Sequence, residues 1–151
     1  MYEKGLCVIC AMPARIHLCK KHRKYYSYDK RYGVFRLRPR IRVSRRQEIL
    51  FKNIRAIFKK PTIQEVTFDF FLYARYDIVV VPEKLIIEFD GEQHFRYVPH
   101  FHKTKQGFED YKEKDERKQK VAEANGWHVA RFSFVEDVGD REYVRKVLPL
   151  K

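Results

Sequence analysis

The chain has 151 residues, 44% of them hydrophobic, which is enough for one domain of ordinary size with a small appendage. No apolar run approaches the length of a membrane span and no signal peptide opens the chain, so we expect a soluble, cytoplasmic protein. The formal net charge of +13 is uneven: residues 1–46 hold 14 basic and two acidic residues (+12), whereas residues 47–151 hold 19 and 18 (+1). This asymmetry predicts a basic binding module joined to a near-neutral domain, with nucleic acid as the partner.

The cysteines lie near the amino terminus and a histidine follows them. The pattern C-x2-C-x8-C-x2-H is formed by Cys7, Cys10, Cys19 and His22. Two close pairs of ligands separated by a loop suit tetrahedral zinc, whereas an odd number of cysteines argues against disulfides. We therefore expect residues 1–30 to form a structural zinc module. His17 is a rival for the fourth ligand position, and three unrelated free thiols are the alternative.

Residues 31–46 interleave basic with apolar side chains. From Phe35 to Val43 the two kinds alternate, so an extended chain places four guanidinium groups on one side, those of Arg36, Arg38, Arg40 and Arg42. The guanidinium groups repeat at intervals of about 7 Å along the chain. Arginine side chains at that spacing can follow a phosphate backbone or enter a minor groove. Pro39 argues against a central strand, so we expect an extended DNA-binding arm. A solvated edge strand guarded by charge is the alternative.

Residues 47–151 have the pattern of a single folded domain. Ser44 is placed to cap a helix over about 45–58, whose apolar stripe consists of Leu50, Phe51, Ile54, Ile57 and Phe58. We expect a strand within 63–70, a helix over about 104–125 ended by Gly126, a strand within 127–134 and a closing helix over 140–148. This order predicts an α/β fold with a mixed central sheet flanked by helices.

Two short β-branched runs, 78–81 and 85–87, each end against acidic residues. Pro82 and a charged pair separate them, which predicts two buried strands joined by a tight turn. In such a hairpin Asp77 lies level with Glu88, and Glu88 and Asp90 point the same way. Carboxylates gathered there repel one another unless a cation sits among them. The alternative, a surface hairpin with solvated acids, fits the apolar flanks less well.

The helix expected over 104–125 carries charge on its apolar face. Asp115 and Lys118 fall on the same face as Phe108 and Tyr111. Charged residues on a packing face are costly unless they are paired or functional. One reading is a salt bridge between the two residues at i, i+3. The other places both beside the acidic cluster, with Asp115 as a metal ligand or as the orienter of a histidine and Lys118 on a phosphate.

The segment Asp77-x(10)-Glu88-x-Asp90-Gly-x-Gln93-His94 resembles the core of the PD-(D/E)xK, or restriction-endonuclease-like, nucleases. It is closest to the very-short-patch-repair-like branch, which includes the EDxHD homing endonucleases of phages. The resemblance covers roughly 44–148, and the amino-terminal segment is similar to short zinc fingers attached to phage nucleases. It implies a restriction-endonuclease-like fold and places Glu48 of the first helix at the border of the active site. One departure is that Asp90 stands where a lysine is usual, so His94 or Lys118 must supply its function.

Phosphodiester hydrolysis needs an activated water, charge stabilisation on the phosphate and a protonated leaving group. We expect Mg²⁺ or Mn²⁺ to be held by Asp77 and Glu88, with Asp90 as a third ligand or as a residue that orients one. Asp69 is a rival of Asp77. We expect His94 to move the proton, because histidine titrates near neutrality, and Gln93 to position the phosphate. His100 and His102 are weaker candidates for the same role.

The sequence thus predicts a metal-dependent DNA endonuclease that nicks or cleaves double-stranded DNA, of homing or repair type, encoded by a phage and acting in a bacterial host. A structure-selective nuclease for branched DNA is a second enzymatic option. A zinc-containing DNA-binding protein with a degenerate nuclease fold is the non-enzymatic alternative. The sequence leaves open whether the protein is a monomer or a homodimer.

Overall fold

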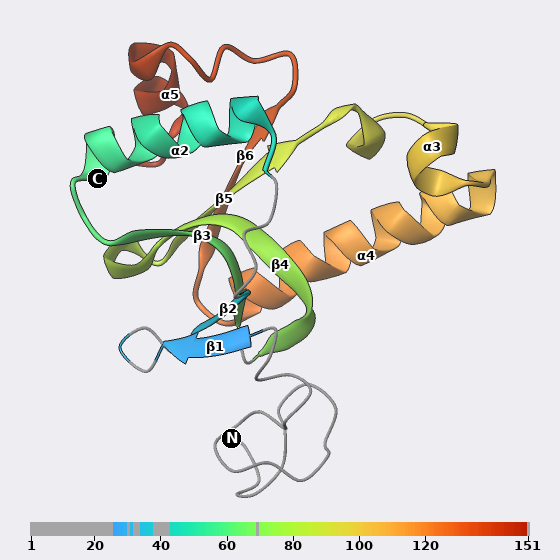
Figure 1. Cartoon of the computed structure of the whole chain (residues 1–151), viewed down its shortest axis with the longest axis horizontal. Helices are drawn as coiled ribbons and strands as arrows, with labels where there is room; N and C mark the ends of the chain where they lie inside the picture. The colour runs from blue at the N-terminus through green and yellow to red at the C-terminus, as the bar shows by residue number, and fades with distance from the viewer. Residues whose placement is uncertain (1–25, 30, 32–33, 38–42, 69, 151) are drawn as a thin grey trace, which may run out of the picture.

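The computed structural model describes residues 26–29, 31, 34–37, 43–68 and 70–150, and Figure 1 shows a sheet with helices on both faces. The strands pair in chain order as a mixed sheet, antiparallel from β1 to β5 and parallel between β5 and β6. The elements are β1 (Tyr26–Asp29), β2 (Val34–Leu37), α2 (Arg45–Phe58), β3 (Thr62–Phe68), β4 (Phe71–Val80), η1 (Val81–Glu83), β5 (Leu85–Asp90), η2 (Glu92–His94), α3 (Pro99–His102), α4 (Lys105–Ala124), β6 (His128–Ser133) and α5 (Arg141–Val147). The mixed α/β architecture predicted from the sequence is confirmed. No helix among the described residues has the length and apolar character that crossing a bilayer requires.

The sheet separates two apolar clusters. One cluster lies between the sheet and the helices α2 and α5, and it contains Leu50 and Ile54 of α2 with Leu85 and Ile87 of β5. The other lies on the opposite face, where Ile86 packs with Ala122 of α4. Neighbouring residues of β5 therefore enter different clusters, as expected for a strand buried on both faces. Figure 1 shows the same layering, with α2 and α5 on one side of the sheet and α4 on the other.

The hairpin of β4 and β5 forms as predicted. Ile78 pairs with Ile87, which places Asp77 level with Glu88 at the next position. The connection is the 3₁₀ turn η1, and Lys84 closes it with a positive φ of 48°. Because Ile86 faces α4, Glu88 and Asp90 face α4 as well. The carboxylates at the end of β5 are thereby presented to one helix.

The helices begin and end close to the positions that the sequence indicates. Ser44 caps α2 by accepting a hydrogen bond from the backbone N–H of Gln47. Thr104 caps α4 in the same way, and Gly126 follows its end with a φ of 83°. Asp140 caps α5. The Thr104 cap fixes where α4 starts, and the start of the helix determines which of its turns face β5.

The amino-terminal part of the described chain differs from the arm expected over 31–46. Residues Val34–Leu37 form β2, which lies between β1 and β3, and Val34 is fully buried in the cluster under α4. This stretch is therefore part of the sheet, and Arg36 is exposed on it. The strand ends two residues before Pro39, which has no N–H to donate to a neighbouring strand. Outside the described residues lie Arg38, Arg40, Arg42, Asp69 and the proposed zinc ligands Cys7, Cys10, Cys19 and His22, with His17.

Candidate active site

An open pocket of about 650 Å³ lies where β4 and β5 face α4. The expected site residues from three separate segments meet there. The residues lining it are Gln47, Glu65, Thr67, Ala74, Arg75, Asp77, Glu88, Phe89, Gln93, His94, Tyr111, Lys114, Asp115 and Lys118. Of the predicted catalytic residues, Asp77, Glu88, His94, Asp115 and Lys118 are among them, and Gln93 is beside them.

Asp77 and Glu88 form the acidic centre of the pocket. The Asp77 carboxylate accepts a hydrogen bond of 2.8 Å from the backbone N–H of Phe89. Glu88 is only 4% exposed, and burial together with the neighbouring Asp77 carboxylate raises the pKa of Glu88 well above its ordinary value. Two carboxylates in this arrangement repel each other, and a divalent cation between them would relieve the repulsion. The pair fits Mg²⁺ or Mn²⁺, because such ions bind one or two carboxylates and fill their remaining positions with water and phosphate oxygens.

Lys118 of α4 supplies a positive charge at the same place. Its Nζ lies 2.8 Å from Glu88 Oε1 and 4.8 Å from the centre of the Tyr76 ring. The Tyr76 hydroxyl donates a hydrogen bond to the backbone carbonyl of Lys118, which ties this turn of α4 to β4. Lys118 thus pairs with Glu88, and not with Asp115 as the salt-bridge reading of the helix proposed. This charge lies close enough to the acidic pair to meet a phosphate bound there.

Asp90 is held by an arginine and does not line the pocket. Arg131 of β6 holds it with two hydrogen bonds of 2.7 Å, one to each carboxylate oxygen. The same guanidinium donates to Asp115 Oδ2 at 2.6 Å and to Gln119 Oε1 at 3.0 Å. With both oxygens engaged by a fork of this kind, Asp90 is an unsuitable magnesium ligand. It belongs to a polar cluster at the edge of the pocket, together with Asp115, which lines the pocket, and Arg131.

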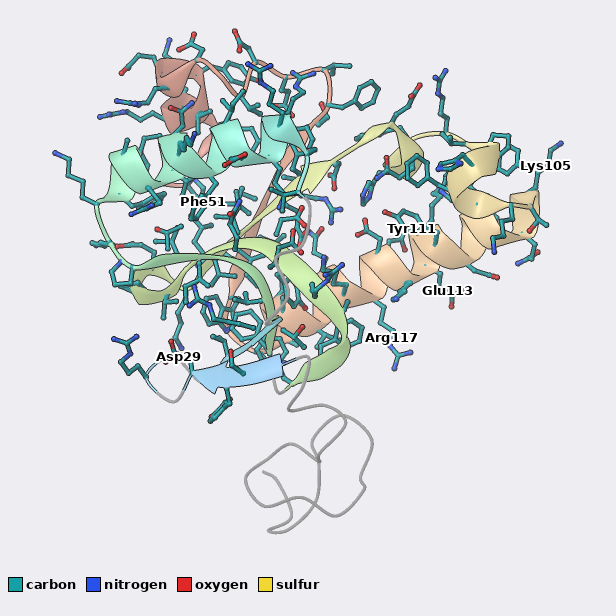
Figure 2. The ribbon with its side chains drawn as sticks, viewed as in Figure 1. Asp29, Phe51, Lys105, Tyr111, Glu113 and Arg117 are labelled. Carbon is teal, nitrogen blue, oxygen red and sulfur yellow. The ribbon has the colours of Figure 1, made fainter. Side chains whose placement is uncertain are left out.

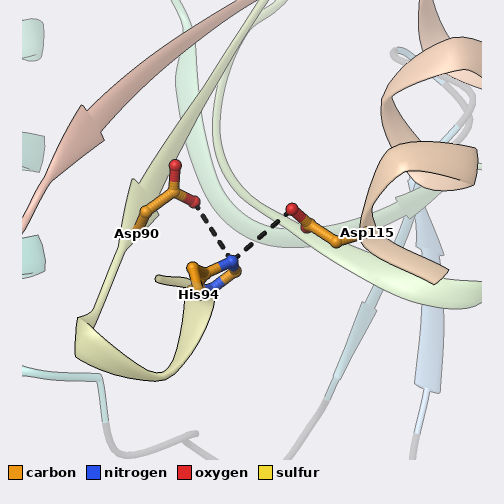
Figure 3. A group of neighbouring side chains, drawn as sticks. All are labelled: Asp90, His94 and Asp115. Carbon is orange, nitrogen blue, oxygen red and sulfur yellow. Dashed lines mark ion pairs between the residues drawn. The ribbon is translucent and has the colours of Figure 1, made fainter. Parts of the chain in front are cut away.

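His94 lies between that cluster and the pocket. Figure 3 shows its Nδ1 between Asp90 and Asp115, at 3.5 Å from an oxygen of each. On its other side Nε2 lies 2.8 Å from the Tyr111 hydroxyl. Burial alone would raise the pKa of Asp115, but the attraction of the neighbouring His94 ring and of the Arg131 charge lowers it below its ordinary value. Asp115 therefore stays ionised and orients the imidazole, which was one of its two expected roles.

The side chains of Asp90, His94 and Asp115 also offer atoms within 4.8 Å of one another, as a metal site would. A cation there would have to displace the Arg131 guanidinium, which already bridges the two carboxylates. The donor set therefore fits an oriented histidine better than a metal centre.

Glu48 lies outside the pocket. It is exposed on α2, and its neighbour Gln47 is the buried residue that reaches the pocket. One residue along a helix turns the side chain by about 100°, so Glu48 points away from the pocket that Gln47 lines. Gln47 donates a hydrogen bond of 2.8 Å to Glu65, a carboxylate that sequence reasoning missed.

Glu65 enters the pocket through an irregularity of the sheet. Its φ is 53°, in the left-handed region, and it lies opposite Asp77 between two paired positions of β3 and β4. Burial, and then the Asp77 charge, raise the pKa of Glu65. The one signal in the sequence was the polar pair Gln64 and Glu65, in a strand whose polar and apolar residues otherwise alternate. That pair breaks the alternation but does not show which way Glu65 points.

His100 and His102 take no part in the pocket, whereas Tyr111 and Arg131, which were not predicted, contact its residues. His102 is buried, and its Nδ1 accepts a hydrogen bond from the backbone N–H of Val98, so it has a structural role. His100 is exposed and does not line the pocket. Tyr111 and Arg131 contact the predicted residues directly, yet only the position of Tyr111 one helical turn before Asp115 hinted at this.

Comparison with known proteins adds little to this geometry. A stretch of 42 residues is 40% identical to an uncharacterised protein, 307L, of Invertebrate iridescent virus 6. The stretch covers 28% of this chain and 21% of the viral protein. No family model matches the chain, and no solved structure matches it.

Proposed function

We propose that this protein is a metal-dependent endodeoxyribonuclease of the restriction-endonuclease-like class that hydrolyses phosphodiester bonds in double-stranded DNA. The observation that carries the proposal is the convergence of Asp77, Glu88, Lys118 and His94 on one pocket from two strands, a helix and a turn. A mixed sheet with helices on both faces is compatible with that class, and the proposal rests on the site rather than on the fold. The basic amino-terminal segment provides the charge for binding DNA.

The residues of the chain divide the work between them. Asp77 and Glu88 would hold a divalent ion, which when bound supplies positive charge to the phosphate and acidifies a water. Lys118 adds an ammonium group beside Glu88, where it can contact a non-bridging phosphate oxygen. His94 is the base that ends protonated when the attacking water gives up a proton, and Asp90 and Asp115 stabilise the imidazolium that results. Gln93, at the rim of the pocket, positions the phosphate.

Plasmid cleavage tests this assignment. Supercoiled plasmid is incubated with the full chain and Mg²⁺ or Mn²⁺, or with EDTA, and nicked and linear products are separated on a gel. We expect cleavage only with the metal, and we expect Asp77→Asn and His94→Ala to remove nearly all of it while both still shift labelled duplex DNA in a binding gel. His100→Ala is the matched control for His94, since His100 is exposed and outside the pocket.

Two results would refute the proposal. The first is wild-type protein that binds DNA but cuts neither duplex nor branched substrates with either metal. That result would favour the non-catalytic DNA-binding protein. Cleavage undiminished in both pocket variants would place the activity elsewhere. Cleavage of a four-way junction but not of plasmid would support the branched-DNA alternative instead.

A further inference from the structure

Tyr111 lies beside the predicted proton acceptor, His94, and both side chains line the pocket. It lines the pocket from α4, and its hydroxyl lies 2.8 Å from His94 Nε2. Figure 2 shows it on the side of α4 toward β5, whereas Glu113 and Arg117 lie on the other side of the helix. Its ring packs edge-to-face against the rings of His94 and His102, with 5.1 Å and 5.3 Å between the ring centres. The hydroxyl is thus held in place by packing on both sides.

The other ring nitrogen of His94 decides which way this hydrogen bond runs. Nδ1 faces Asp90 Oδ1 and Asp115 Oδ2, each at 3.5 Å. These contacts are longer than a full hydrogen bond, and their effect is electrostatic. A lone pair on Nδ1 would face two carboxylate oxygens, whereas an N–H there is attracted by both. The neutral imidazole therefore carries its proton on Nδ1 and its lone pair on Nε2.

The Tyr111 hydroxyl must then be the donor to Nε2. Burial, followed by the charges of Asp115 and Asp90, raises the pKa of Tyr111 to about 12, so the hydroxyl keeps its proton at neutral pH. Arg131 bridges Asp90 and Asp115 from the far side and keeps both in place. The consequence is that the basic nitrogen of His94 is already occupied by a hydroxyl that itself borders the pocket.

We infer that the Tyr111 hydroxyl is the proton-transfer link between a water in the pocket and His94. This rests on the proposed function. An O–H bond of the attacking water breaks as its oxygen bonds to phosphorus, and that proton passes to Tyr111 Oη. The original Tyr111 proton moves to His94 Nε2, which gives a neutral phenol and an imidazolium facing Asp90 and Asp115. The P–O bond to the leaving oxygen breaks, that oxygen takes a proton from solvent, and the imidazolium returns its proton to solvent.

Nuclear magnetic resonance of the full chain with ¹⁵N-labelled histidine tests the arrangement without any need for activity. We expect neutral His94 as the Nδ1–H tautomer, with a Tyr111 hydroxyl proton protected from exchange and close to Nε2. In Tyr111→Phe that proton disappears while the tautomer is retained, and the exposed His100 serves as the internal reference. An Nε2–H tautomer in the wild type would overturn the inference.

Single-turnover cleavage tests the chemical role. We expect Tyr111→Phe to lower the rate by about 10²-fold, the usual contribution of one proton-transfer group, without weakening the binding of Mn²⁺ or DNA. The double variant Tyr111→Phe/His94→Ala should be no slower than His94→Ala alone, because the two groups act in series. Tyr97→Phe is the control, since its hydroxyl contacts only the Lys103 carbonyl among the described groups.

The outcomes separate the two proposals. Full activity in Tyr111→Phe, or losses that multiply in the double variant, would overturn the link and leave the nuclease assignment intact. A wild type that does not cut DNA would refute the nuclease, and with it the role in hydrolysis. The tautomer experiment would still decide whether Tyr111 donates to His94.

Discussion

Lys118 and Glu88 form an ion pair between α4 and β5, with Nζ 2.8 Å from Oε1 and exposed side-chain fractions of 13% and 6%. The resembled nucleases usually carry a lysine at the place of Asp90, two residues after Glu88. In this protein the ammonium group near Glu88 comes from Lys118 of α4, the helix that packs over β5. The sequence allowed either His94 or Lys118 to stand in for that lysine, and the geometry favours Lys118 for the charge.

Replacing Lys118 should cost both activity and stability. Lys118→Met leaves Glu88 buried without its cation, and breaking such a pair costs about 3 kcal/mol. The pKa of Glu88 then rises further, so the folded protein binds a proton more tightly than the unfolded chain. The free energy of unfolding should therefore recover as the pH falls from 8 to 5, as measured by urea titration. The exposed Lys120→Met is the matched control.

The double variant Glu88→Gln/Lys118→Met checks the origin of that loss. Since it removes both charges, it should regain most of the stability and show a weaker dependence on pH. A deficit in Lys118→Met that is equal at both pH values would show that the cost comes from packing against Tyr76 rather than from charge.

Binding of the divalent ion should release a proton. The raised pKa of Glu88 means that the carboxyl is protonated at pH values below that pKa, and a cation must displace the proton. The affinity for Mn²⁺ should therefore strengthen as the pH rises toward the pKa and level off above it. Calorimetry in two buffers of different ionisation enthalpy measures the protons released. Glu88→Gln should bind more weakly, with no such release, and an affinity independent of pH in the wild type would contradict the assignment.

Asp115 should contribute to acid sensitivity. Its pKa in the folded protein is lowered from 3.8, so the unfolded chain takes up the proton first as the pH falls. The stabilisation is thus present above about pH 4 and is lost as the pH falls through the lower, folded value. Asp115→Asn should be less stable by about 1–2 kcal/mol at pH 7, and the two unfolding curves should converge below pH 4. The exposed Asp110→Asn should run parallel to the wild type.

The amino-terminal ligands predict one zinc ion per chain. Elemental analysis of the purified full chain measures it directly, and Cys10→Ser should lower the content strongly, since thiolates dominate such sites. His22→Ala should lose zinc and His17→Ala should retain it if the regular spacing holds. The opposite result would make His17 the fourth ligand, and zinc content unchanged in Cys10→Ser would leave the cysteines as free thiols.

The arginines that follow β2 should act through phosphate contacts. Replacing Arg38, Arg40 and Arg42 together by alanine removes three such contacts, each worth about 0.9 in the slope of log affinity against log salt concentration. The slope should fall by about 2–3 units, whatever the DNA sequence. An unchanged slope, measured by fluorescence anisotropy on a duplex, would remove these residues from the interface.

Local patterns were enough to predict most of the fold. Apolar periodicity and capping residues placed α2, α4 and α5, and the two β-branched runs placed the hairpin that brings Asp77 level with Glu88. These features depend on a few neighbouring residues, which is why a single sequence reveals them. The pocket residues that the patterns identified follow from the same hairpin and the same face of α4.

The missed features depend on backbone detail or on distant contacts. Glu65 points into the pocket because of one left-handed residue in β3, which no alternation of side chains predicts. Gln47 and Glu48 are adjacent on α2, and the apolar stripe of a helix does not show which of two neighbouring residues at its border faces a pocket. The contacts of Asp90 come from Arg131, 41 residues further along, which no pattern near Asp90 indicates.

The place of β2 inside the sheet matters for anyone who divides this protein into pieces. A fragment that starts at residue 47, where charge alone draws the boundary, would uncover the side of β3 that pairs with residues 34–36 of β2. Bare strand borders of that kind recruit other chains, so the fragment would tend to self-associate or precipitate. Expression of the carboxy-terminal part alone should begin ahead of Tyr26. Such a fragment keeps β1 and β2 paired with the sheet and still lacks the cysteines.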